Sequence, residues 1–137
     1  MIKFLGRDAE SGKWSEDHCQ MYIVQEARRA GYDVAASLEA VQCGKYQAAR
    51  LKAGGMTAGE PDLRFYLPDG KIKMVELKAA KGKKSEAQTK RHQKLWDLGF
   101  DVCTIWADNP VDGWNKVKDY LDINLLKELE KNYWGAD

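Results

Sequence analysis

Residues 61–78 read PDLRFYLPDGKIKMVELK. The central Pro68-Asp69-Gly70 is a strong turn signal, and the residues on both sides have the composition and alternation of β-strands. We therefore predict an antiparallel hairpin, with one strand at residues 62–67 and the other at residues 71–78.

The register of this hairpin determines which side chains face each other. Facing residues have a constant index sum, and closing the turn between Leu67 and Lys71 sets that sum to 138. Asp62 is then predicted to face Glu76, with Cβ atoms about 4.5–5.5 Å apart, where like charges destabilise a sheet. Lys78 lies two residues beyond Glu76 and therefore shares its face. Two carboxylates and a lysine are expected to converge at one end of the hairpin.

This trio has the chemistry of a phosphodiesterase site. Mg²⁺ often takes one or two carboxylates, while waters and phosphate oxygens complete its shell. A bound ion would relieve the repulsion between Asp62 and Glu76, stabilise charge on a phosphate and lower the pKa of a bound water. Lys78 could position that water or neutralise the phosphate. A Glu-x-Lys triplet alone is far more often a surface ion pair, so the surrounding motifs decide the matter.

Two helices are predicted on either side of the hairpin. Ser15 is an expected N-cap, and apolar residues recur at helical spacing over residues 16–30, where Gly31 ends the pattern. The second helix follows Ser85, which forms an expected capping box with Gln88. Its apolar positions are Ala87, Leu95 and Leu98, and Gly99 ends it.

The other elements are less sharply defined. Residues 34–51 mix strand and irregular character, residues 101–106 form an expected strand, and the chain after Pro110 is expected to form two helices broken near Asp122. This order fits an α/β sandwich, with a central mixed sheet flanked by helices and a helical C-terminal tail.

Length and composition indicate one globular domain over residues 1–137, in which residues 122–137 are expected to form a helical tail. The sequence has neither a membrane-spanning apolar run nor a signal peptide, so we expect no membrane association and a cytoplasmic location. Residues 71–94 carry nine basic and two acidic side chains, whereas residues 108–137 are acidic. Three residues, Cys19, Cys43 and Cys103, are expected to be reduced, and His18 and His92 are expected on helix surfaces.

Several separated motifs together resemble the VRR-NUC family of the PD-(D/E)xK nuclease superfamily. They are the glycine-rich approach LKAGGMTAGEPDL at residues 51–63, VELK at 75–78, KGKKSEAQ at 81–88, and Gly99 followed by the strand at 102–107. The resemblance covers roughly residues 13–121 and includes a PD-(D/E)xK core fold. It is closest in form to the compact, stand-alone members carried by phages, which would act in the cytoplasm of a bacterial host.

The resemblance implies roles for individual residues. Asp62 and Glu76 match metal ligands, the carbonyl of Leu77 matches a third ligand, and Lys78 matches the catalytic lysine. Gln88 matches a glutamine on the helix after the active-site strand, a role compatible with capping. Two glutamates compete for the acid of the first helix: Glu16, which is preferred, and Glu26, which lies off the same helical line.

The function implied is a Mg²⁺-dependent DNA endonuclease, with Mn²⁺ able to substitute. Lys81, Lys83 and Lys84 are expected to contact the DNA backbone, together with Lys90 and Arg91 on the following helix. Family members of this compact type cut branched DNA, including Holliday junctions, as homodimers. A flap or single-strand nuclease with the same site, and a catalytically silent DNA-binding module, are the alternatives.

Overall fold

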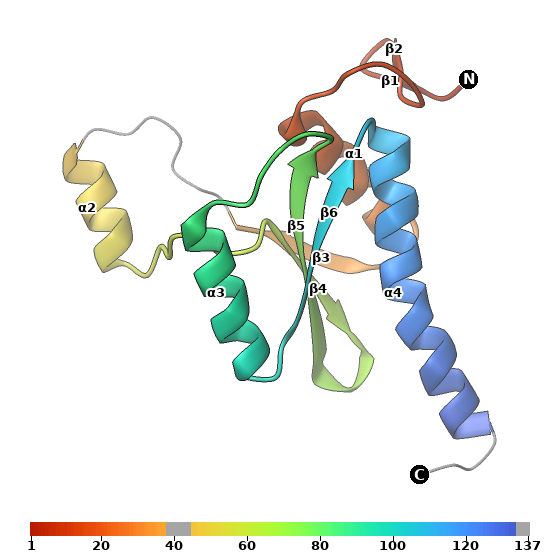
Figure 1. Ribbon diagram of the computed structural model, residues 1–137. Helices are drawn as coiled ribbons and strands as arrows, with labels where there is room; N and C mark the ends of the chain where they lie inside the picture. Colours follow the sequence, from red (N-terminus) through yellow and green to blue (C-terminus); the bar gives the residue numbers. More distant parts are fainter. Residues whose placement is uncertain (38–44, 134–137) are drawn as a thin grey trace. The chain divides into compact units, whose positions relative to one another are not determined.

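The computed structural model describes residues 1–37 and 45–133, with side chains up to residue 122 (Figure 1). The chain divides into two compact units. The first consists of residues 1–32, 77–82 and 105–137, and the second consists of residues 33–76 and 83–104. Residues 38–44, which include Cys43 and belong to the stretch at 34–51 that the sequence left ambiguous, lie outside the described residues.

The predicted hairpin is present in the expected register. Strand β4 (Leu63–Leu67) and strand β5 (Lys71–Ala79) are joined by a 3₁₀ turn, η1 (Pro68–Gly70). Leu63 pairs with Val75 and the ladder continues to the turn, so each pair has the predicted index sum of 138. Asp69 has φ 64°, and the glycine after it also has positive φ, as such a tight turn requires.

Two further strands complete a four-stranded sheet with the order β3-β4-β5-β6. Strand β3 (Asp33–Ala36) pairs antiparallel with β4, whereas β6 (Asp101–Ala107) runs in the same direction as β5 (Figure 1). The sheet is therefore mixed, as predicted. Strand β5 is an inner strand of the sheet, and residues 73–77 on it are all buried.

Within the second unit, helix α3 (Glu86–Asp97) packs on the sheet. The contact is a buried cluster of Met74, Leu95 and Val102, and the partly buried Ile72 packs against this cluster. The inner face of α3 differs from the prediction, because Ala87 and Leu98 are exposed and His92 is fully buried. His92 and Leu95 lie three residues apart and therefore occupy one face of the helix. The expectation of a surface histidine at this position was wrong.

Helix α2 (Lys45–Ala53) was not predicted from the sequence. It contains no buried side chain, so no apolar periodicity marks it. Its composition of Lys, Gln, Ala, Arg and Leu favours a helix by intrinsic propensity alone.

The first unit is built around two helices. Helix α1 (Glu16–Arg29) is N-capped by Ser15, as predicted, and it packs against α4 (Pro110–Tyr133) (Figure 1). Gly113 permits close packing there, because a Cβ on it would lie 3.1 Å from side-chain atoms of both Ile23 and Ala107. A short hairpin of β1 (Lys3–Phe4) and β2 (Arg7–Asp8) precedes α1. Aromatic side chains of this unit pack nearby: Phe4, Trp14, Tyr22 and the half-buried His18.

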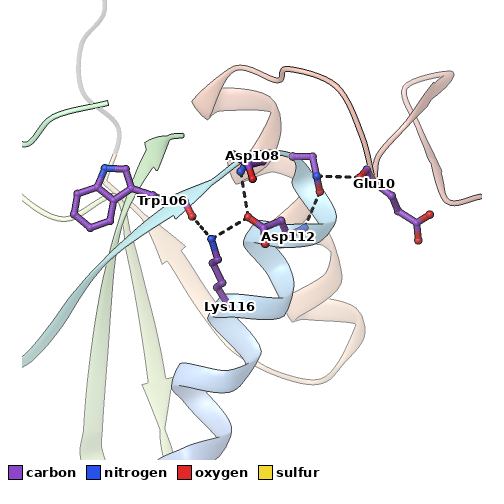
Figure 2. A network of polar contacts seen from close by, with 6 residues as sticks. Glu10, Trp106, Asp108, Asp112 and Lys116 are labelled. Atoms are coloured by element: carbon purple, nitrogen blue, oxygen red, sulfur yellow. Dashed lines mark hydrogen bonds and ion pairs between the residues drawn. The ribbon is translucent and has the colours of Figure 1, made fainter. Parts of the chain in front are cut away.

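Helix α4 begins in a polar network (Figure 2). The Asn109 side chain accepts a hydrogen bond from the backbone N–H of Asp112 and donates one to the carbonyl of Glu10. Asp112 in turn accepts from the backbone of Asp108 and forms an ion pair with Lys116. An asparagine N-cap followed by proline at the first helical position explains where the helix starts.

The predicted break near Asp122 is wrong, because α4 continues without interruption from Pro110 to Tyr133. The side chain of Asp122, which suggested the break, accepts a hydrogen bond of 2.8 Å from the Tyr32 hydroxyl. Among the described residues, no helix combines the length and the apolar character needed to cross a bilayer.

Candidate active site

Asp62 and Glu76 occupy the open end of the β4–β5 hairpin. The last ladder pair is Leu63 with Val75, and Asp62 and Glu76 are the next residues beyond it on the two segments. Asp62 also holds the end of β3, because its carbonyl accepts a hydrogen bond of 2.8 Å from the backbone N–H of Ser37. Glu76 is only 1% exposed, whereas Asp62 is half-buried. A carboxylate as buried as that of Glu76 needs hydrogen bonds or compensating positive charge.

Gln88 connects this pair to the start of α3. Its side-chain oxygen accepts a hydrogen bond of 2.9 Å from the Ser85 backbone, and the Ser85 hydroxyl accepts one from the Gln88 backbone. These contacts form the predicted capping box. The amide nitrogen of the same side chain donates to Oε1 of Glu76. The capping function and a contact with the candidate site therefore belong to one side chain.

The strand beyond Glu76 carries Leu77 and then Lys78, which is half-buried and lies on the same face as Glu76. In the first unit, a carboxylate oxygen of Glu16 accepts a hydrogen bond of 3.3 Å from the backbone N–H of Ala79. Glu26 points elsewhere and forms an ion pair of 3.0 Å with Arg29. Of the two competing glutamates, Glu16 is the one that contacts the end of β5.

The loop after β5 is held by a contact that the sequence did not suggest. The indole N–H of Trp106 donates a hydrogen bond of 2.7 Å to the carbonyl of Gly82, while the Gly82 N–H donates to the carbonyl of Ala79. Lys81 and Lys83, on either side of this glycine, are exposed. Nothing in the local sequence links a tryptophan on β6 to this loop.

The other predicted DNA contacts have different environments. Lys84 is half-buried, with its Nζ 5.5 Å from the centre of the Trp96 ring, and Lys90 forms an exposed ion pair with Glu86. Arg91 forms an ion pair of 3.0 Å with Glu60, which immediately precedes Pro61-Asp62 in the sequence.

The donors at the hairpin end suit a hard cation. Among the described residues, no group of three or more His, Cys, Asp and Glu side chains is placed to hold a metal ion. Asp62 and Glu76 supply two carboxylates, and the carbonyl of Leu77 follows directly in the strand. Two carboxylates are sufficient for Mg²⁺, which keeps several waters and accepts phosphate oxygens. Oxygen-only donors favour Mg²⁺ or Mn²⁺ over softer metals.

The described cysteines do not supply a competing nucleophile. Burial raises the pKa of the Cys19 thiol to about 11, and it also raises the pKa of Cys103. Both side chains are therefore thiols near neutral pH, and neither forms a disulfide.

Comparison with known proteins supports the fold. No protein-family model and no curated protein matches the sequence. A solved structure described as "VRR_NUC domain protein" has a TM-score of 0.64 and 18% identity, covering 82% of this chain and 92% of the other. A second, described as "VRR_NUC domain", has a TM-score of 0.51 and 20% identity, covering 78% and 94% respectively. The chain has a VRR-NUC fold, which confirms the predicted α/β architecture.

Proposed function

Because the chain has a VRR-NUC fold, we propose that it is a metal-dependent DNA endonuclease that hydrolyses phosphodiester bonds. The observation that supports this proposal is the hairpin ladder ending at Leu63 with Val75, because the same register continued by one residue would bring Asp62 opposite the buried Glu76. Two facing carboxylates repel each other and destabilise a folded sheet. A divalent cation bound between them would relieve that repulsion and could also bind a phosphate oxygen.

In this proposal Asp62, Glu76 and the carbonyl of Leu77 hold Mg²⁺, and Mn²⁺ can replace it. When bound, the metal supplies charge stabilisation at the phosphate and a more acidic water. Gln88 holds the Glu76 carboxylate in one orientation through its amide N–H. Lys78 presents a compact positive charge to a phosphate oxygen or to the attacking water.

Glu16 acts in this scheme at the end of β5. Its hydrogen bond to the backbone of Ala79 fixes the strand one residue after Lys78. The exposed Lys81 and Lys83 then bind the sugar-phosphate backbone without reading bases.

We further propose branched DNA, such as a Holliday junction, as the substrate of a homodimer. One chain carries one such site, so symmetric cleavage of a four-way junction needs two copies related by a two-fold axis. A flap or single-strand nuclease would use the same residues, and only the substrate preference would differ.

The test is cleavage of a labelled four-way junction beside matched linear, flap and single-stranded DNA, in Mg²⁺, Mn²⁺ or chelator. The Glu76→Gln variant preserves the shape of the side chain and should lose more than about 100-fold in rate, since even supporting residues of metal sites cost 10–100-fold. Glu86→Gln, at an exposed glutamate ten residues along the chain, is the control and should cleave normally.

Three outcomes separate the possibilities. Paired symmetric nicks in the junction would support a dimeric resolvase, whereas preference for the flap or the single strand would favour the alternative nuclease. Binding of DNA by both proteins without any cleavage would identify a silent DNA-binding module and refute the catalytic roles of Asp62, Glu76 and Lys78.

A further inference from the structure

The segment before Asp62 packs directly on α3. Gly59 has φ +79°, and a Cβ placed on it would lie 2.4 Å from the carbonyl oxygen of Ala87 and 2.7 Å from the backbone nitrogen of Gln88. Only glycine allows the two backbones to come this close. Pro61, the residue before Asp62, is fully buried. The path of the chain into Asp62 is therefore set against the first turn of α3.

An ion pair fixes the same segment one turn further along the helix. Nε of Arg91 lies 3.0 Å from Oε1 of Glu60, and the two side chains are 24% and 20% exposed. The other oxygen of Glu60 lies 3.7 Å from Arg64 on β4. A charge-assisted hydrogen bond between partly buried groups is stronger and less screened than an exposed surface pair.

One stretch of α3 thus contacts the segments of both acids. Gln88 and Arg91 are three residues apart, so their side chains project from the same side of the helix. Gln88 contacts Glu76 itself, and Arg91 contacts Glu60, two residues before Asp62. Because the helix is rigid over one turn, these two contacts together constrain the distance between the two carboxylates.

We propose that Arg91 is a positioning residue, which acts through Glu60 to hold Asp62 opposite Glu76 and so sets the affinity of the site for its metal. This inference rests on the proposed function and assigns Arg91 a task other than the DNA contact expected from the sequence. A site that must hold a small cation in near-octahedral geometry is sensitive to such support.

The first experiment measures Mn²⁺ binding by isothermal titration without DNA. Arg91→Gln should weaken Mn²⁺ binding about tenfold, within the range typical of residues that support metal ligands. The Mg²⁺ concentration for half-maximal cleavage should rise by a similar factor. Lys94→Gln removes a positive charge from an exposed position of the same helix, outside the predicted DNA contacts, and should leave Mn²⁺ affinity unchanged.

The second experiment exchanges the charges. The double variant Glu60→Arg/Arg91→Glu should recover Mn²⁺ affinity relative to either single change, because the ion pair is restored in reverse. This readout remains informative if a single variant is too unstable to purify. Binding of the junction in chelator, and its dependence on salt, should be the same for Arg91→Gln and the unaltered protein.

The outcomes distinguish this inference from the proposed function. If Arg91→Gln binds Mn²⁺ normally but loses DNA affinity with a shallower salt dependence, Arg91 is a DNA contact and the inference is refuted. If the unaltered protein binds Mn²⁺ but cuts no DNA, the nuclease proposal fails while the effect of Arg91 on the metal still decides the inference. Absence of Mn²⁺ binding in the unaltered protein would refute the inference about Arg91, and absence of cleavage as well would refute both.

Discussion

The side-chain amide nitrogen of Gln88, in the first turn of α3, donates a hydrogen bond to the carboxylate of Glu76 on β5. The oxygen of the same amide accepts from the backbone of Ser85 and caps the helix. Each half of the amide thus has a separate partner, one structural and one at the candidate metal site. The two contributions can be separated by substitutions that change only one half of the group.

Gln88→Glu should reduce cleavage, and repulsion between the new carboxylate and the buried Glu76 should also lower stability. The glutamate keeps the oxygen that caps α3 but loses the N–H donor and adds a negative charge beside Glu76. Gln88→Ala removes both contacts and should also lower the free energy of unfolding by about 0.5–2 kcal/mol, the usual cost of a lost cap. Cleavage rates and urea unfolding of the two variants check this. A cleavage rate for Gln88→Glu equal to that of the unaltered protein would show that the amide N–H plays no part at the site.

Asp62→Asn should stabilise the protein in chelator and remove its stabilisation by Mg²⁺. Replacing one of two facing carboxylates relieves a repulsion of about 0.2–1 kcal/mol. The unaltered protein should gain about 2.7 kcal/mol when free Mg²⁺ is 100 times its dissociation constant. Urea unfolding with and without Mg²⁺ measures both effects, with Glu86→Gln as the control. A similar Mg²⁺ effect in both proteins would place the ion elsewhere.

Gly59→Ala should destabilise the protein by about 2–4 kcal/mol, combining a strained positive φ with a steric clash. Its new Cβ would lie 2.4 Å from the Ala87 carbonyl oxygen, so the segment before Asp62 must move. Gly55→Ala is the matched control, because Gly55 also has positive φ but has nothing within 4 Å of a new Cβ. Thermal or urea unfolding should show about 1–2 kcal/mol for the control. Equal losses would mean that the close approach is unimportant.

The hairpin and the helix caps were predictable because they depend on local chemistry. A three-residue turn at Pro68–Gly70 fixes the register without reference to the rest of the fold. Ser15 and Ser85 fix helix starts through contacts only three residues away. The prediction that Asp62 faces Glu76 extends this register by one residue beyond the observed ladder.

The features that sequence did not predict depend on distant contacts or lack any periodic signal. Burial of His92 reflects the packing of α3 on the sheet, and the Glu60–Arg91 pair joins residues 31 positions apart. The unbroken course of α4 through Asp122 accompanies a hydrogen bond from Tyr32, 90 residues earlier. Such pairings are set by the tertiary fold and leave no local pattern.

Tyr32→Phe should destabilise the protein at neutral pH by about 1.5–3 kcal/mol, the usual contribution of a hydrogen bond to a charged group. Burial, and then the neighbouring Asp122, raise the pKa of Tyr32 from 10.0 to about 12. Since the folded pKa is the higher one, the phenol's contribution is complete below pH 10 and is lost between pH 10 and 12. The stability difference between the two proteins should therefore narrow across that window.

Urea unfolding at several pH values measures this difference. Tyr66→Phe, at an exposed tyrosine on β4, is the control and should change stability little at any of them. A constant difference between Tyr32→Phe and the unaltered protein from pH 8 to 12 would contradict the role of Asp122.

Replacing Lys81 and Lys83 together by Gln should weaken DNA binding by a similar factor for every sequence tested. Both side chains are exposed in the loop that Trp106 holds through Gly82. If each lysine neutralises one phosphate, the slope of log affinity against log salt should become shallower by about 1.8 for duplex arms. Binding in chelator separates this effect from cleavage.

Lys71→Gln provides the matched control, because this exposed lysine lies at the opposite, turn end of β5. It should leave both affinity and salt slope close to those of the unaltered protein. Trp106→Phe tests the anchor itself: it keeps both lysines but removes the hydrogen bond to Gly82, so the affinity should fall while the salt slope stays nearly the same. A steeper loss for one DNA sequence than another would instead indicate that this loop reads bases.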